Sequence, residues 1–291
     1  MRIDLHTHSS VSDGTEDART LIRKAAETGL DVVALTDHDT AEGWPEAEAM
    51  AAEAGITLVR GMEISTAVGR ASVHLLAYLP DPTYPPLAAA LAKILDGRNS
   101  RVPAICAKLH DLGFDITVED IRRRAADAAA TGRPHVADVM IEVGIVATRD
   151  EAFERFLNPG RPAYVDRYAV PLAEAIGLVT DSGGVGVIAH PWGRGKSGVL
   201  TEETLAGLRD QGLVGIEVDH QDHPPEAREA LRAIARNLDL VVTGSSDHHG
   251  TGKIDHDLGC NTTAPEQFER LLHLTAEAAV ASGRPAPGLL A

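Results

Sequence analysis

Residues 1–40, MRIDLHTHSSVSDGTEDARTLIRKAAETGLDVVALTDHDT, contain the unit that decides the fold. The apolar segments 1–5 and 31–35 predict two strands, and the amphipathic stretch 16–28 between them predicts a helix that Gly29 ends. A strand, a helix and a strand in this order predict a parallel sheet that is covered by helices. The same alternation predicts strands at 56–59, 72–78, 185–189, 215–218 and 240–243, and helices at 41–54, 171–181, 202–211, 225–237 and 265–281. The outer parts of the chain therefore predict an α/β fold.

The middle of the chain, residues 97–167, interrupts this alternation. Helices are predicted at 102–112, 118–130, 135–143 and 149–157, and the stretch contains no convincing strand. It carries 11 Lys and Arg residues and 11 Asp and Glu residues, so its formal charge is zero. The net charge of −16 therefore belongs to the rest of the chain. We predict a neutral helical insertion in an acidic α/β body.

The composition of the 291 residues excludes several classes of protein. A net charge of −16 argues against a general binder of long nucleic acid, because phosphate neutralisation needs a basic surface. There is no run of 18 apolar residues to span a membrane, and the N-terminus is too polar for a signal peptide. The two cysteines, Cys106 and Cys260, provide no disulfide framework, so we expect a cytoplasmic location.

Histidines and carboxylates follow the predicted strands at regular places. Thirteen histidines are present, and several follow predicted strands. In a (β/α) barrel the carboxyl ends of the strands meet on one face, and that face holds the active site. The pairs His6/His8 and Asp247/His249 are spaced i, i+2, so each pair projects to one side of extended backbone, while His248 points elsewhere. The candidate ligands are His6, His8, Asp13, His38, Glu63, His74, His190, Asp247 and His249.

This set of side chains favours a metal centre. Imidazole and carboxylate groups without thiolates suit divalent transition metals. Nine ligands are too many for one ion of ordinary coordination, so two or three ions with a bridging carboxylate are predicted. Asp4 and Asp39 are expected either to orient neighbouring imidazoles or to bind metal. Five other histidines have no partner at ligand spacing and are expected at the surface: His110, His220, His223, His256 and His273.

Six short motifs in order carry a resemblance to a known family. They are DLHTHS (4–9), TDHD (36–39), GMEIS (61–65), VHLLAY (73–78), AHPW (189–192) and SDHH (246–249). In this order they resemble the polymerase-and-histidinol-phosphatase (PHP) family of metal-dependent phosphoesterases. Within the family the chain is most similar to small bacterial enzymes that remove phosphate from nucleoside 3′,5′-bisphosphates or trim short oligoribonucleotides from the 5′ end.

The resemblance implies a fold and a division of the chain. The fold is a distorted seven-stranded (β/α)7, TIM-like barrel with a helical insertion. Residues 1–96 and 168–291 would form the discontinuous barrel, and 97–167 the insertion that covers the active site as a lid. Three divalent ions are implied, with Mn²⁺ expected and Fe or Zn as alternatives.

The resemblance also implies roles for individual residues. His6, His8, Glu63 and Asp247 would hold the first ion. Glu63 would bridge to a second ion that His74 and His190 also hold. Asp13, His38 and His249 would hold the third. In the motif GRPH (132–135), Arg133 and His135 would contact phosphate, and they join Asp247 and Glu63 as predicted catalytic residues.

The predicted function is the hydrolysis of a small phosphorylated nucleotide. A 3′,5′-nucleoside bisphosphate would give the 5′-monophosphate, and short 5′-phosphorylated oligoribonucleotides are further candidate substrates. Metal ions lower the pKa of water from about 15.7 toward about 7 and so provide a hydroxide nucleophile. Such ions dominate the local field, so the acidic body does not exclude an anionic substrate. His135 and a metal-bound water both stay open as the acid for the leaving oxygen.

Three other functions compete with this one. A histidinol-phosphate phosphatase would share the metal ions and differ in the pocket. An amidohydrolase-type deaminase also begins with HxH, but that family commonly has a lysine on the fourth strand, where His74 lies here. A non-catalytic metal-binding module is the third alternative. The sequence leaves the metal, the exact substrate, the choice between monoester and diester, and the oligomeric state open.

Overall fold

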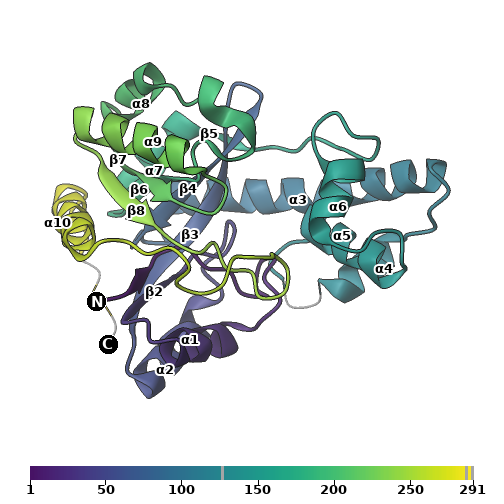
Figure 1. Cartoon of the computed structure of the whole chain (residues 1–291), viewed down its shortest axis with the longest axis horizontal. Helices are drawn as coiled ribbons and strands as arrows, with labels where there is room; N and C mark the ends of the chain where they lie inside the picture. Colours follow the sequence, from purple (N-terminus) through teal and green to yellow (C-terminus); the bar gives the residue numbers. More distant parts are fainter. Residues whose placement is uncertain (126–127, 286–287, 290–291) are drawn as a thin grey trace.

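Seven strands of the described residues follow one another in a sheet that nearly closes into a barrel. A computed structural model describes residues 1–125, 128–285 and 288–289 of the chain (Figure 1). The strand order is β1-β2-β3-β4-β6-β7-β8, and the short β5 pairs with β3. The two ends of the sheet meet just beyond β1 and β8, where His8 N donates to His248 O at 2.8 Å. The strands are β1 (Ile3–Asp4), β2 (Val32–Leu35), β3 (Thr57–Val68), β4 (Ala71–Tyr78), β5 (Val170–Pro171), β6 (Val185–Ala189), β7 (Leu213–Asp219) and β8 (Val241–Gly244).

One strand runs against the predicted parallel order. β3 is much longer than the predicted strand at 56–59, and it turns tightly at residues 69–70 into β4. Gly69 has a φ of 58°, a conformation that glycine adopts without steric cost. β4 is therefore antiparallel to both β3 and β6, whereas the β1-β2-β3 and β6-β7-β8 runs are parallel. The α/β class is confirmed, and the expectation of a wholly parallel sheet was wrong.

Amphipathic helices pack around the barrel and bury their apolar faces. The first, α1, begins after Asp17, whose side chain accepts from Thr20 N, and it buries Leu21 and Ile22. Gly55, with a φ of 68°, ends the second. The barrel helices are α1 (Ala18–Glu27), α2 (Trp44–Ala54), α7 (Leu172–Asp181), α8 (Glu202–Arg209), α9 (Pro225–Asn237) and α10 (Pro265–Ala281), with the short 3₁₀-helix η2 (Gly193–Gly198). Their bounds agree closely with the predicted helices.

The middle of the chain is helical and has an apolar core of its own. It contains α3 (Pro85–Asp111), α4 (Val118–Arg124), α5 (Arg133–Glu142), α6 (Arg149–Ala152) and the π-helix η1 (Phe153–Leu157). This group projects from the side of the barrel on the far half of α3 (Figure 1). Ile105, Leu109, Ile121 and Met140 belong to its apolar cluster, which is separate from the clusters of the barrel.

The single helix α3 connects the two parts. It spans the predicted boundary at 96/97 without a break, and it contains Pro103. The predicted helix at 118–130 ends earlier, at Arg124, and its residues 126–127 lie outside the described ones. The division of the chain at 96/97 and 167/168 stays a prediction.

Three contacts fix the helical part over the end of the barrel. Arg98 Nε donates to Asp39 Oδ2 at 2.8 Å, and Arg149 Nη1 donates to the backbone oxygen of Asp13 at 2.7 Å. Ala129 N also donates to Val11 O at 2.8 Å. The helices therefore contact the loops that follow β1 and β2. No helix in the described residues is long and apolar enough to cross a membrane.

Candidate metal centre

The nine predicted ligands lie in or after six strands and converge at one end of the barrel. Eight of them have at most a tenth of the side chain exposed, and His74 has 19% exposed. His6, His8 and Asp13 follow β1, His38 follows β2, Glu63 lies in β3, His74 lies in β4, His190 follows β6, and Asp247 and His249 follow β8. His74 reaches this end because β4 is antiparallel, which pairs it with Ser65 of β3 and Ala189 of β6.

The first group of ligand atoms surrounds the two histidines that follow β1. His6 Nε2 lies 3.0 Å from His8 Nε2, 3.4 Å from Glu63 Oε2 and 3.4 Å from Asp247 Oδ1. His8 Nε2 lies 3.2 Å from Glu63 Oε2 and 3.5 Å from Asp247 Oδ1. Two imidazole nitrogens and two carboxylate oxygens thus face one another across a single small space.

The Glu63 carboxylate faces two separate sets of rings. Its Oε1 lies 2.7 Å from His74 Nδ1 and 3.2 Å from His190 Nε2. Its Oε2 faces His6, His8 and also His38 Nδ1, which is 3.2 Å away. Burial alone would raise the pKa of this carboxyl. The charges of the surrounding rings, among which His74 has the largest effect, hold the pKa well below its ordinary value. Glu63 is therefore placed to bridge two groups of ligands.

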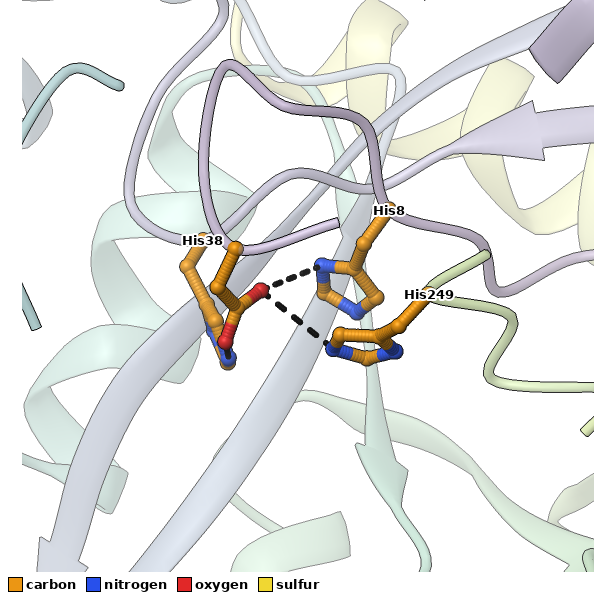
Figure 2. A group of neighbouring side chains, drawn as sticks. His8, His38 and His249 are labelled. Carbon is orange, nitrogen blue, oxygen red and sulfur yellow. Dashed lines mark ion pairs between the residues drawn. The ribbon is translucent and has the colours of Figure 1, made fainter. Parts of the chain in front are cut away.

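In a third group, the rings of His8, His38 and His249 lie close together (Figure 2), and they surround the Asp13 carboxylate. Its Oδ1 lies 3.3 Å from His249 Nε2 and 3.8 Å from His8 Nδ1, and its Oδ2 lies 3.6 Å from His38 Nε2. Burial and then the charge of the His8 ring lower the pKa of His249 to about 4. His249 therefore presents a neutral ring at pH 7, which is the form that binds metal.

Unsatisfied polar atoms show that the residues fit divalent ions. Asp247 Oδ1 is buried and has no hydrogen-bond partner among the described residues, although it faces His6 and His8. A buried carboxylate oxygen in this position is costly unless a cation or a donor neutralises it. The donors are imidazole and carboxylate, the set that Mn, Fe, Zn or Co accepts. Several groups of three or four such side chains bring their ligand atoms within 4.8 Å of one another.

Two buried residues hold candidate ligands by hydrogen bonds and were not predicted from the sequence. They are Glu217, described here, and His220, described below. Glu217 Oε1, in β7, lies 3.1 Å from His6 Nδ1, and its Oε2 accepts from His190 N at 2.7 Å. An ionised carboxylate only accepts hydrogen bonds, so His6 Nδ1 donates and Nε2 is the nitrogen that faces the other ligands. A glutamate inside the apolar strand LVGIEVD was the available signal in the sequence.

The expectation that His220 and His223 lie at the surface was wrong. Both are buried, and His220 Nε2 lies 3.2 Å from Asp247 Oδ2. His220 Nδ1 accepts from Asp222 N at 3.0 Å, so Nε2 carries the proton and donates to the carboxylate. His220 therefore orients Asp247. His256 is half-buried, with Nδ1 2.7 Å from Ser246 O.

Other predictions had mixed outcomes. His110 and His273 are exposed, as expected, and the His248 ring faces His256 O and Glu16, away from the ligands. Asp4 and Asp39, which were expected either to orient imidazoles or to bind metal, contact no imidazole among the described residues and belong to none of the ligand groups. Asp39 accepts from Ser65 and Arg98, and Asp4 accepts from the backbone N–H groups of His6, Ser246 and Gly259. Asp4 thus holds backbone around the ligand loops, and Asp39 connects the loop after β2 with the helical part.

A cavity of about 220 Å³ opens over the ligand groups. Seven of the nine predicted ligands line it, and its other walls are strongly basic. The basic residues are Arg98, Arg101, Arg133, Arg149, Arg167 and Lys253, and Lys253 Nζ contacts Asp247. Arg133 thus lines the cavity, and its contact with phosphate stays a prediction. His135 is buried beside it and does not line the cavity, and its Nδ1 accepts from Gly132 N at 3.0 Å.

Comparison with known proteins agrees with this geometry. Residues 4–118 match the model of the PHP domain. The chain is 33% identical to the 3′,5′-nucleoside bisphosphate phosphatase of Chromobacterium violaceum, over 90% of this chain and 92% of the relative. The chain belongs to the PHP family. It is also 32% identical to a 5′-3′ exoribonuclease of Haemophilus influenzae, over 85% of this chain and 90% of that protein.

Two solved structures have the same fold. A putative metal-dependent phosphoesterase of Bifidobacterium adolescentis has a TM-score of 0.89 and 36% identity, over 94% of this chain and 96% of that one. A structure of a Chromobacterium violaceum amidohydrolase with bound sulfate has a TM-score of 0.85 and 32% identity, over 94% and 97%. This PHP protein is therefore a metal-dependent phosphoesterase, a hydrolase that acts on phosphate esters, and the predicted resemblance is confirmed.

Proposed function

We propose that this PHP protein removes the 3′-phosphate from a nucleoside 3′,5′-bisphosphate. The observation that carries the proposal is the Glu63 carboxylate, whose two oxygens face two separate sets of imidazole nitrogens below a basic cavity. The names of the relatives support a phosphorylated nucleotide as the substrate. Short 5′-phosphorylated oligoribonucleotides are the second candidate, because the 5′-3′ exoribonuclease relatives match a similar share of the chain.

The nine ligands would hold three divalent ions, with Mn²⁺ expected. His6, His8, Glu63 and Asp247 would hold the first, Glu63, His74 and His190 the second, and Asp13, His38 and His249 the third. Such ions act as Lewis acids and lower the pKa of water to about 7. Glu217 and His220 would keep His6 and Asp247 in place by their hydrogen bonds.

Residues of the helical part would bind the substrate phosphate and exclude water. Arg133 lines the cavity, and its Nη1 donates to Leu157 O at 2.9 Å, so its guanidinium is held in position. The buried His135 ring accepts the Gly132 N–H at Nδ1, which leaves the ring proton on Nε2, and its contact with phosphate stays a prediction. Residues 97–167 would form the lid, supported by the bonds of Arg98 and Arg149 to the ligand loops.

The basic cavity argues against the main alternatives. Histidinol phosphate carries one phosphate and an ammonium group, so it would use a basic cavity less fully than a bisphosphate. A deaminase acts on an amino group and needs no such charge. A non-catalytic module would need neither the cavity nor the arginines.

Phosphate release tests the proposal. Protein stripped with a chelator and reloaded with Mn²⁺ is incubated with adenosine 3′,5′-bisphosphate, histidinol phosphate and a 5′-phosphorylated trinucleotide. We expect release of one phosphate from the bisphosphate, adenosine 5′-monophosphate as the product, and no turnover while the chelator is present. Preference for histidinol phosphate, or no release with Mn²⁺, Fe²⁺, Zn²⁺ or Co²⁺, would contradict the proposal.

Replacing Glu217 by Gln should weaken metal binding. Removal of a carboxylate that orients a ligating histidine costs about 10–100-fold in metal affinity. We therefore expect the E217Q variant to need about that much more Mn²⁺ for half-maximal binding, measured by isothermal titration calorimetry. Asp219→Asn is the matched control, because Asp219 lies on the same strand but pairs with Arg232 away from the ligands. Equal Mn²⁺ affinity of E217Q and wild type would rule out this role.

Metal binding should release protons and strengthen with rising pH. Burial disfavours the charged His8 ring, but the neighbouring Asp247 and Glu63 carboxylates raise the pKa of His8 to about 9 in the metal-free protein. The raised pKa means that the ring is protonated at pH 7, so the metal displaces a proton. Apparent Mn²⁺ affinity should therefore rise from pH 7 to about 9. Calorimetry in two buffers of different ionisation enthalpy measures the released protons, and a pH-independent affinity would contradict the prediction.

A further inference from the structure

We propose that Arg149 couples the docking of the helical part to the binding of one metal ion, the one assigned to Asp13, His38 and His249. The inference rests on the proposed function, which places three ions in the centre, and it identifies a positioning residue that acts through a ligand loop. Arg149 is the first residue of α6 and has 9% of its surface exposed. It lies where the helical part meets the loops that follow β1 and β8.

The Arg149 guanidinium contacts three separate segments of the chain. Its Nε and Nη2 donate to the two carboxylate oxygens of Asp138 in α5, at 2.6 and 2.7 Å. Its Nη1 donates at 2.7 Å to the backbone oxygen of Asp13, in the loop after β1. Gly252, in the loop after β8, is so close that a Cβ there would lie 2.9 Å from Arg149 Cζ and closer still to Nη1. One side chain thus joins the helical part to both loops.

The same two loops carry two ligands of one ion. Asp13 Oδ1 lies 3.3 Å from His249 Nε2. The loops are also bonded to each other, because Thr15 N and Gly252 N donate to His249 O at 3.1 and 3.2 Å. Arg149 holds the peptide group of Asp13, and the direction of a side chain follows the position of its own backbone. The geometry of this ligand group therefore depends on the docking of the helical part.

Polar contacts, and not a shared apolar core, join the two parts beside these loops. The apolar cluster that contains Met140 is separate from the clusters of the barrel. A second cavity, of about 260 Å³, lies between the parts, and residues of both line it, among them Ile141 and Thr251. Arg149 lines this cavity and also the cavity over the ligand groups. Regions with few buried apolar contacts separate at a low cost in free energy, so a single buried guanidinium has a large effect here.

The charge of Arg149 is compatible with a metal ion nearby. The bidentate pair with Asp138 balances the positive charge within the helical part. Nη1 donates to the carbonyl oxygen of Asp13, which leaves the carboxylate to face His249 with Oδ1 and His38 with Oδ2. Arg149 therefore positions the ligand without competing with the ion for its oxygens.

Such a coupling acts in both directions. If the docked helical part raises the affinity for the ion, the bound ion favours docking by the same factor. An ion held by Asp13 and His249 would keep the two loops together, and these loops form the surface that Arg149 contacts. The helical part should therefore be held more firmly in the metal-loaded protein than in the metal-free protein.

Binding of Mn²⁺ tests the inference without any substrate. Equilibrium dialysis of chelator-treated protein compares the wild type with Arg149→Met. We expect R149M to bind two ions as the wild type does and the third about 10–100-fold more weakly, as when other groups that hold a ligand are removed. Arg155→Met is the matched control and should bind like the wild type, because Arg155 is exposed on η1 and pairs with Glu151. Unchanged binding of all ions in R149M, or an equal loss for all of them, would overturn the inference.

A second variant tests the same contact from the barrel side and removes no charge. In Gly252→Ala the new Cβ would displace the Arg149 guanidinium from Asp13. Affinity for the third ion should therefore fall by about tenfold or more in G252A. In R149M/G252A the second substitution should add less than about a twofold loss, because the side chain that it displaces is already absent. Losses that add in the double variant would overturn the inference, since Gly252 would then act on the His249 loop directly.

Hydrogen exchange separates failure of this inference from failure of the proposed function. Mn²⁺ should slow amide exchange in residues 133–157 of the wild type and have much less effect there in R149M. The helix α10, on the opposite side of the barrel from the helical part, provides the internal reference (Figure 1). Mn²⁺ that binds to the wild type without protecting residues 133–157 would contradict the coupling even if phosphate is released as proposed. Protection that Arg149 controls, in a protein that releases no phosphate, would support the coupling and contradict only the proposed function.

Discussion

Replacing Asp247 by Asn is expected to lower phosphate release by about 10³-fold or more, because metal ions contribute several kcal/mol of charge stabilisation in such reactions. Asp247 is buried, and its Oδ1 faces His6 and His8 without a hydrogen-bond partner among the described residues. The amide is isosteric but carries no charge to hold a cation. We expect less bound Mn²⁺ by elemental analysis, with the circular dichroism spectrum unchanged.

The control for this variant lies in the same loop. Asp255 is exposed and has no part in the ligand groups, so Asp255→Asn should keep wild-type activity and metal content. The same experiment separates an enzyme from a structural metal-binding module. A D247N protein with activity within about tenfold of wild type and a lowered melting temperature would favour the module and contradict the assignment of Asp247.

Replacing Arg98 by Met is expected to lower the free energy of unfolding by about 3–5 kcal/mol, because it leaves a buried charge without its partner. Asp39 is fully buried, and Arg98 is its only basic partner among the described residues. The same guanidinium donates to Ser65 Oγ at 2.9 Å, on the strand residue that pairs with His74. Urea unfolding of the metal-free protein measures the loss.

A double variant provides the internal check. In R98M/D39N the uncompensated charge is gone, so the double variant should be more stable than R98M alone. A single R98M variant as stable as the wild type would show that the Asp39 contact does not stabilise the helical part on the barrel.

Most of the fold could be predicted from the sequence because local patterns determine it. The helices at Pro225–Asn237 and Pro265–Ala281 match their predicted bounds, since apolar spacing and flanking residues mark both. The direction of β4 could not be predicted. A strand has the same alternation in either direction, and its register with Ser65 and Ala189 depends on its neighbours in the sheet.

The meeting of the nine candidate ligands at one end of the barrel could be predicted for a similar reason. Seven of them follow a strand, and the end of a strand is a local feature of the sequence. The residues that hold the ligands depend on contacts across the barrel. His220 was expected at the surface because no spacing rule connects it with Asp247, and Glu217 meets His6 only when β7 and β1 come together.

An anomalous-difference map of Mn²⁺-loaded crystals tests the central claim most directly. The account predicts three peaks at the end of the barrel: one among His6, His8, Glu63 and Asp247, one among Glu63, His74 and His190, and one among Asp13, His38 and His249. No peak among these residues in crystals of protein that releases phosphate, or peaks held by other side chains, would contradict it.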